Sequence, residues 1–271
     1  MKLIALGALA AWALVQSGLF AGEIVDHRDG AWIALATAGV MLLAALVSNI
    51  AGFAFCALAG SALAYLGTDP VRAVQAMVVC STATQVYAVW TLRDVIRWRS
   101  LGSMIAAGTA TIPLGVWLLV HVDAGYYAAA LGAFLTAYGG YLLLRRGSLV
   151  VEGTPLRDAM AGALGGIAGG LAGLPGSIVT IWCGMRGWDR LRQRAVYQPY
   201  ILAMQVVTVI CLRLQALVRM SLAQDLRYVP FALLGALGGL AIFRRITNGQ
   251  FRTAVGVLLA VSGVGLLART W

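Results

Sequence analysis

Charge is scarce in this sequence: only 11% of its 271 residues are charged, and 61% are hydrophobic. Soluble domains carry roughly 25% charged residues, so this chain has too few to cover a surface exposed to water. Its apolar runs are long and continuous, which is the pattern of helices that cross a lipid bilayer. The sequence therefore predicts an all-α polytopic membrane protein.

Acidic residues are especially few, and none lies in the middle of an apolar run. Ionisable groups within the membrane mark cation paths and proton relays. Their absence there argues against a divalent-metal transporter, a carboxylate-based proton pump and an intramembrane protease. We therefore expect no enzyme activity, catalytic residue, metal or cofactor. The ten acidic residues are Glu23, Asp26, Asp29, Asp69, Asp94, Asp123, Glu152, Asp158, Asp189 and Asp225.

Histidine and cysteine are also sparse. The two histidines, His27 and His121, lie in short polar connections and have no partners at metal-ligand spacing. The four cysteines form no C-x-x-C pair, and each lies inside an apolar segment, where a small buried residue is expected. They are Cys56, Cys80, Cys183 and Cys211.

The basic residues outnumber the acidic ones, and the formal net charge is +10. Of the 20 basic residues 19 are arginine, and no polar domain exists that would present them to a nucleic acid. In a membrane protein such residues set orientation and contact lipid headgroups. We assign Arg192 and Arg194 to topology, with attraction of substrate as the alternative. A small anionic substrate is compatible with this charge.

Spanning the bilayer takes roughly 20 helical residues. Helices are predicted at 2–22, 71–92, 101–120, 126–144, 195–212, 229–243 and 252–268. The first segment has features of a signal peptide, but the polytopic chain that follows favours a retained helix. Two further runs, 31–67 and 158–184, are too long and too rich in glycine for one simple span. Each is either a hairpin of two short helices or one helix followed by a half-helix.

The two halves of the chain match each other over most of their length. Gly-Ser occurs in both glycine-rich runs at an offset of 116, and further matches follow at 117 to 124. A slowly drifting offset over more than 90 residues indicates an internal duplication. We divide the chain into residues 1–30, an N-terminal helix and loop, repeat 1 at 31–146 and repeat 2 at 147–271. Matches include Gly52 with Gly169, Gly67 with Gly184, Gln85 with Gln205, Arg93 with Arg213 and Arg145 with Arg269.

The distribution of arginines distinguishes parallel from inverted repeats. If each glycine-rich run enters and leaves on the same side, the halves are inverted, with 14 basic residues inside and 6 outside. If each run crosses once, the halves are parallel, and the split is 11 to 9. The sequence therefore favours two inverted repeats in one transmembrane domain, 1–271. Each repeat has a broken or re-entrant glycine-rich helix pair plus three transmembrane helices.

The apolar runs offer neutral hydrogen-bonding groups in place of charge. The start of a half-helix leaves N–H groups unpaired at the positive end of its dipole, which suits an anion. We expect such starts at both Gly-Ser pairs, because glycine admits an anion to the backbone and serine caps the helix. Helix packing is the alternative role for these residues. The neutral groups are Ser48, Asn49, Ser61, Ser81, Thr82, Thr84, Gln85, Ser177, Thr180, Gln198 and Gln205. The expected substrate site comprises Gly176, Ser177 and Gln205, with Gly60, Ser61, Asn49 and Gln85 opposite.

Two stretches carry a resemblance to a known family. Residues 162–177, GALGGIAGGLAGLPGS, precede an apolar run, a basic loop and Ala195. In the first half IAGFAF at 50–55 precedes DPVRAVQ at 69–75 and the basic segment 93–98. Over residues 31–268 the chain resembles the TauE/SafE sulfite exporter family. CALAG at 56–60 departs from the Gly-Gly-rich turn common there, so the resemblance rests the site more on the second half.

The resemblance implies a multi-pass permease of a bacterial-type inner (plasma) membrane. Its substrates would be sulfite, sulfoacetate, other sulfonates and related small anions, moved by alternating access at the repeat interface. The alternative is a non-transporting assembly or accessory protein, with tight packing at both Gly-Ser pairs and a stable partner. The expected partners are a small anion and the lipid bilayer, and no nucleic acid; a homo-oligomer is left open.

Overall fold

The computed structural model describes residues 30–51, 55–96, 98–144, 151–214 and 225–243, together with separate positions between 253 and 268. The regular elements of these residues are helices. The helix predicted at 2–22 lies outside the described residues, and the one at 252–268 is described only in part. The other predicted spans are confirmed as α5 (Pro70–Leu92), α6 (Trp98–His121), α7 (Ala124–Leu144), α10 (Arg190–Leu214) and α12 (Val229–Phe243).

Three of the described helices contain stretches that are long and apolar enough to cross a membrane. These stretches are Leu101–His121, Gly125–Leu144 and Leu191–Leu214, in α6, α7 and α10. Large apolar side chains such as Trp117 and Leu144 are exposed on α6 and α7. Lipid tails are as apolar as these side chains, so exposure to the bilayer carries no penalty.

Each glycine-rich run folds as a long helix followed by a short one. In the first half these are α3 (Gly30–Ala51) and α4 (Phe55–Tyr65), and in the second α8 (Pro155–Ala172) and α9 (Gly176–Met185). At 1.5 Å per residue the short helices are about 15 Å long, half of a hydrocarbon core of about 30 Å. Of the two arrangements considered, one helix followed by a half-helix is therefore confirmed.

Each half-helix returns toward the end of the molecule from which its long partner starts. Asp158, in the first turn of α8, contacts Trp182 and Arg186 at the end of α9. In the first half Ile33 near the start of α3 and Leu63 near the end of α4 line the same cavity. In each run the start of the long helix and the end of the half-helix therefore lie at the same end of the molecule.

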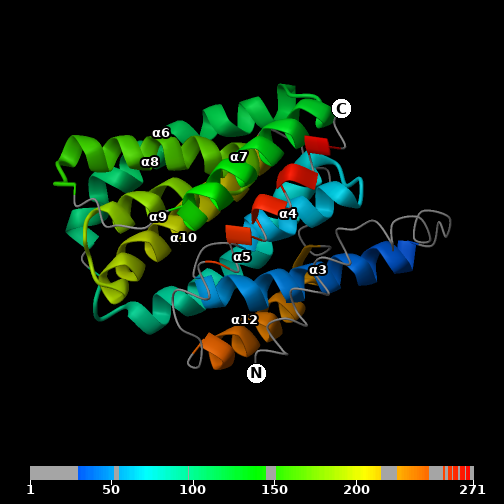
Figure 1. Ribbon diagram of the computed structural model, residues 1–271, viewed down its shortest axis with the longest axis horizontal. Helices are drawn as coiled ribbons and strands as arrows, with labels where there is room; N and C mark the ends of the chain where they lie inside the picture. The colour runs from blue at the N-terminus through cyan, green and yellow to red at the C-terminus, as the bar shows by residue number, and fades with distance from the viewer. Residues whose placement is uncertain are drawn as a thin grey trace.

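The first helix of each half packs along a later helix of the other half (Figure 1). The α8 glycines face α6: a Cβ on Gly162 would lie 2.2 Å from the carbonyl oxygen of Met104, and one on Gly166 the same distance from that of Gly108. On α12 a Cβ on Gly235 would lie 2.1 Å from the carbonyl oxygen of Leu42 in α3. Only glycine permits this approach, so packing is the structural role of these three positions.

Helices α5 and α10 pack against each other in antiparallel orientation between these outer pairs. Leu92 at the end of α5 clusters with Ala195 near the start of α10. Further along, Ser81 in the middle of α5 contacts Gln205 in α10. As the residue number falls along α5, it rises along α10, so the two helices begin at opposite ends of the molecule.

The structure corrects the local register of the matched segments. The sequence alignment pairs Gly67 with Gly184, but the glycine in the corresponding turn is Gly187. Gly67 and Gly187 have φ of 68° and 64°, a conformation that glycine adopts without strain. Asp69 and Asp189 follow at the same offset of 120, and each carboxylate accepts a hydrogen bond from the backbone N–H three residues later. The sequence comparison missed this register because the runs contain many glycines, so that Gly67 could be paired with more than one of them.

Candidate functional site

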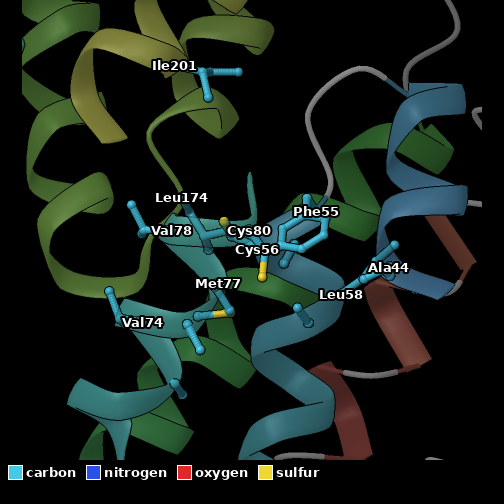
Figure 2. Close-up of a cluster of buried hydrophobic side chains, with 14 of the residues drawn as sticks. Ala44, Phe55, Cys56, Leu58, Val74, Met77, Val78, Cys80, Leu174 and Ile201 are labelled. Carbon is cyan, nitrogen blue, oxygen red and sulfur yellow. The ribbon is translucent and has the colours of Figure 1, made fainter. Parts of the chain in front are cut away.

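The centre of the molecule lies where the two half-helices begin. Gly173, in the break before α9, has φ of 67°, and a Cβ there would lie 3.4 Å from Val78 of α5 and 3.7 Å from Cys56 of α4. Leu174 lies beside Val78 and Cys56 in the buried cluster of Figure 2. The break before α9 and the first turn of α4 therefore meet on the middle of α5.

A hydrogen bond between two buried side chains joins α5 to α10 at this level. Gln205 Nε2 donates to Ser81 Oγ over 2.6 Å, and the two residues are 1% and 2% exposed. Gln85 lies one turn beyond Ser81 on the same face of α5 and is also buried. The structure thus brings Gln205 and Gln85 to the same helix pair, as expected, and adds Ser81 between them.

Several buried polar atoms of the described residues have no hydrogen-bond partner. Two of them are the side-chain carbonyl oxygens of Gln85 and Gln205. Thr180 Oγ1 in α9 and Gln198 Oε1 in α10 are two more. Leaving such a group unsatisfied costs about 1–3 kcal/mol. The three amide oxygens can only accept a hydrogen bond, so they suit a ligand group that donates one, whereas the Thr180 hydroxyl can do either.

The expected helix start at Gly60-Ser61 is wrong. Helix α4 begins at Phe55, so both residues lie in its interior. A Cβ on Gly60 would lie 3.2 Å from Met77 Sδ of α5, which indicates helix packing. Ser61 Oγ donates to the Leu58 carbonyl oxygen within the same helix. The sequence Gly-Ser suggested a start, but the break that precedes α4 falls before Phe55.

The expected start at Gly176 is confirmed, but the capping role of Ser177 is not. Gly176 is the first residue of α9, and Pro175 occupies the N-cap without a side-chain hydrogen bond. Ser177 Oγ donates 2.8 Å to the Leu174 carbonyl oxygen instead. The Ser177 hydroxyl thus satisfies a carbonyl group at the break. Pro175, whose φ angle is fixed by its ring, leads the chain into the helix.

Asn49 lies apart from these contacts in the described structure. Its amide donates to the Ala45 carbonyl oxygen one turn earlier in α3. A Cβ on Gly239 of α12 would lie 3.2 Å from the Asn49 Cβ, so this residue belongs to the packing between α3 and α12.

A cavity of about 450 Å³ lies at the end of the molecule where α10 begins. It is lined by Asp158, Arg186, Trp188 and Arg192. The guanidinium groups of Arg186 and Arg192 lie 4.7 Å and 4.6 Å from the Trp188 ring centroid. Arg192, which the sequence suggested as a topology determinant, therefore also faces a cavity.

Asp225 is the polar residue whose environment the sequence did not indicate. It is a helical residue four positions before α12, and it is only 7% exposed and accepts a hydrogen bond from Gln75 Nε2 of α5. Burial raises the pKa of this carboxyl, against the opposing effects of the Gln75 hydrogen bond and of Arg213, Arg227 and Arg72. This burial could not be predicted from the local sequence, because Gln75, which contacts Asp225, lies on α5, 150 residues away.

The helical fold, the half-helices and the buried uncharged polar centre are features of a membrane transporter. A model of the family "Sulfite exporter TauE/SafE" matches residues 36–266. The chain belongs to this family of membrane transporters and is not an enzyme.

Among curated proteins, the chain is similar to the probable inner membrane transporter protein TsaS of Comamonas testosteroni. The two are 25% identical over 186 residues, which cover 65% of this chain and 74% of that protein. The family identifies the chain as a membrane transporter, and three of the described helices are long and apolar enough to cross a membrane. No solved structure matches it.

Proposed function

We propose that this protein is a secondary permease for a small oxyanion, either sulfite or an organosulfonate such as sulfoacetate. The observation that carries the proposal is the buried, uncharged polar centre formed by Ser81, Gln85 and Gln205 between α5 and α10. Amide and hydroxyl groups bind an oxyanion through hydrogen bonds and leave no buried cation behind when it departs. Gly176, at the start of α9, would add its backbone N–H at the positive end of a helix. The Ser177 N–H donates to the Leu174 carbonyl oxygen over 3.3 Å and would exchange this partner for the anion.

The unpartnered carbonyl oxygens of Gln85 and Gln205 favour an anion that also carries a proton. Hydrogensulfite has one O–H donor besides its acceptor oxygens, so it would donate to one of these two carbonyl oxygens and accept from neighbouring N–H and O–H groups. A fully deprotonated anion would require the amides to turn their NH₂ groups toward it. We keep Gly60, Ser61 and Asn49 as outer residues of the site, because their hydrogen bonds and packing leave them a smaller role in binding.

Alternating access between two inverted repeats is the proposed mechanism. Three observations support it. Helices α5 and α10 are antiparallel, and each half-helix ends near the start of the long helix that precedes it. Helices α3 and α8 each pack against a helix of the other half. The segments around Arg93 and Arg186 lie at the same end of the α5–α10 pair, which agrees with the arginine count that places both inside. We retain residues 31–146 and 147–271 as the repeats of one domain.

Flux of sulfite, thiosulfate and sulfonates into reconstituted vesicles tests the proposal. Replacing Gln205 by Met keeps the volume and removes the hydrogen bonds. We expect Gln205→Met to reduce flux about tenfold or more, since about 1.4 kcal/mol of lost binding is a factor of ten.

Thr208→Val is the matched control. Thr208 is buried one turn away on α10, and its hydroxyl donates only to the Met204 carbonyl oxygen of the same helix. We expect its flux to stay within about twofold of the original protein, since this hydroxyl bonds within its own helix and is not among the groups proposed to bind the anion. Absence of flux for every anion, or equal flux in the two variants, would contradict the proposal.

A further inference from the structure

A second cavity, of about 150 Å³, lies at the end of the molecule where α5 begins. Its polar lining comprises Thr68, Arg72, Gln75, Asp225 and Arg227. A water molecule takes up about 30 Å³ in the liquid, so the cavity has room for about five. That volume suits a single oxyanion group with a small substituent.

This cavity corresponds in position to the one of about 450 Å³ at the other end. Arg72 and Arg192 line the two cavities at an offset of 120, and so do Gln75 and Ala195. Since α5 and α10 are antiparallel, the cavities open at opposite ends of the pair. The arginine count places the smaller cavity on the outer face of the membrane.

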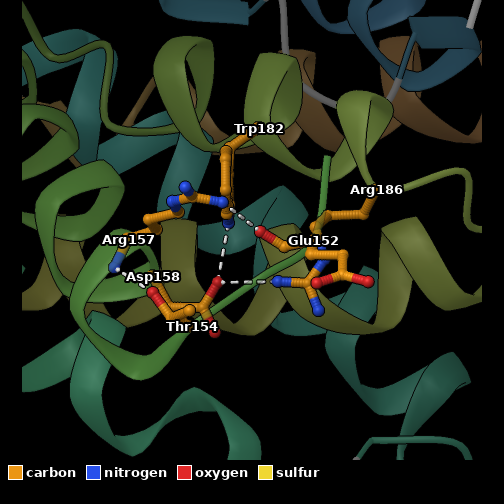
Figure 3. A network of polar contacts seen from close by, with 6 residues as sticks. All are labelled: Glu152, Thr154, Arg157, Asp158, Trp182 and Arg186. Carbon is orange, nitrogen blue, oxygen red and sulfur yellow. Dashed lines mark hydrogen bonds and ion pairs between the residues drawn. The ribbon is translucent and has the colours of Figure 1, made fainter. Parts of the chain in front are cut away.

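The two cavities differ in how their carboxylates are held. At the α10 end, Asp158 accepts a hydrogen bond of 2.7 Å from Trp182 Nε1 and forms an ion pair of 3.3 Å with Arg186 (Figure 3). Asp189 accepts from the backbone N–H of Arg192 as a helix cap. Both carboxylates therefore have hydrogen-bond partners, and Asp158 also has an ion-pair partner.

Asp225 is held more weakly in its charged form. Its partner is the neutral amide of Gln75, which is itself 3% exposed.

Charged and titratable groups nevertheless surround Asp225 on several elements. Arg72 and Cys80 face it from α5, Arg213 from α10, and Arg227 and Tyr228 from its own segment. The helices α3 and α4 contribute only uncharged side chains to the cavity lining. Three arginines therefore surround one buried carboxylate, and the charges next to this cavity are predominantly positive.

We propose that the smaller cavity binds a small oxyanion and that Asp225 takes up a proton when the anion enters. The inference rests on the proposed function, because it makes this cavity the outer entry point for the transported anion. An ionised Asp225 would repel an oxyanion a few ångströms away, whereas the protonated carboxyl becomes a hydrogen-bond donor. The proton comes from the solution on this face and returns to it, and only the O–H bond of Asp225 is made or broken.

Anion and proton then promote each other's binding, because coupling between two sites is reciprocal. The anion would bind tightly at low pH and more weakly as pH rises through the Asp225 midpoint. Arg72 and Arg227 provide the attraction at every pH, since arginine stays charged. Burial of Asp225, which raises its pKa, brings the midpoint closer to physiological pH.

Binding of methanesulfonate to the purified full chain in lipid-free detergent, measured over a pH series at constant ionic strength, tests the proposal. A sulfonate stays ionised throughout this range, so only the protein titrates. We expect affinity to fall about tenfold per pH unit above the midpoint, the slope for one linked proton. Asp225→Asn should bind as tightly as the original protein does at low pH, with no pH dependence.

Asp94→Asn is the control, because Asp94 has a side chain that is 85% exposed and lies at the opposite end of α5. It should retain the original slope. A slope that persists in Asp225→Asn, or its absence in the original protein, would overturn the proposal. Tighter binding of glycerol 3-phosphate than of methanesulfonate would assign the cavity to a lipid headgroup and overturn it too.

Gln75→Met provides a second test that keeps the carboxyl group. Removing the amide deprives ionised Asp225 of its hydrogen bond, so the midpoint of the pH dependence should move to higher pH. An unchanged midpoint would count against the proposal even if Asp225→Asn failed to fold.

Flux separates this proposal from the proposed function. Proton-linked binding without flux of any anion would refute only the permease. Flux accompanied by binding that is independent of pH would refute only the role of Asp225.

Discussion

Asp225 lies four residues before α12 and is 7% exposed, although the polar residues Gln224 and Arg227 lie close to it in the sequence. The hydropathy pattern places it in a connection, whereas the structure has Asp225 and Leu226 in helical conformation, followed by a turn that leads into α12. What the pattern omits is the approach of Gln75, which is 150 residues away along the chain. At the residue scale the chemistry of a side chain thus depends on a partner from another helix.

The stability of the protein should therefore depend on Asp225 and pH. The folded state holds this proton more tightly than the unfolded chain, whose carboxyl titrates near 3.8. Between these two pKa values the folded state binds more protons, so the free energy of unfolding falls as pH rises through that window. Asp225→Asn should remove this slope.

Thermal unfolding in detergent without added anion measures the effect. Asp94→Asn should retain the slope, because Asp94 is exposed in both states. A slope of opposite sign in the original protein would indicate a carboxyl whose pKa is lowered by folding. That result would contradict the burial argument.

At the scale of secondary-structure elements, helices α6 and α8 pack closely against each other. The α8 glycines recur every fourth residue and lie against α6 backbone, and Thr111 Oγ1 donates 2.7 Å to the Ala163 carbonyl oxygen across the same contact. The glycine-rich sequence did not identify the partner helix. The two helices fit each other because their surfaces are smooth where they meet: only glycine allows two helix backbones to approach so closely.

Gly166→Ala should weaken this contact. Its Cβ would lie 2.2 Å from the Gly108 carbonyl oxygen and 2.3 Å from Thr111 Oγ1, so the helices must separate. We expect a loss of about 1–3 kcal/mol in the free energy of unfolding, measured in detergent. Gly102→Ala on α6, where no atom lies within 4 Å of the added Cβ, should leave stability unchanged or raise it. Equal destabilisation of both variants would indicate that α6 and α8 do not pack closely.

At the scale of the whole molecule, α5 and α10 define two ends. Asp69 and Asp189 occupy the same local position, each capping the helix that follows, yet the structure places them at opposite ends of the pair. Asp94 lies at the same end as Asp189, because the end of α5 packs on the start of α10. The inverted arrangement predicts that these two ends face opposite sides of the membrane.

Labelling of single cysteines by a membrane-impermeant maleimide in intact cells tests this prediction. In a cysteine-free background, Asp69→Cys should react from outside. Asp189→Cys and Asp94→Cys should react only after the membrane is opened. The first two variants lose the same helix cap, so they serve as controls for each other. Labelling of Asp69→Cys and Asp189→Cys from the same side would refute the inverted arrangement.

The sequence by itself determined the membrane class, the boundaries of most helices and the family. These follow from local properties: the length of apolar runs, the scarcity of charge and the turn residues between helices. The half-helix at Gly176 was also predictable, because Pro175 marks its start. The helix start predicted at Gly60-Ser61 was wrong, because a local pattern of small residues does not distinguish a helix start from a packing surface.

Only the tertiary structure decided which polar groups meet. It brought Gln205 to Ser81, covered Asp225 with Gln75 and placed Arg72 and Arg192 in cavities at opposite ends. These contacts join residues about 120 to 150 positions apart. Helix propensity and hydropathy act over a few turns, whereas the packing of helices across two halves fixes which faces are buried together.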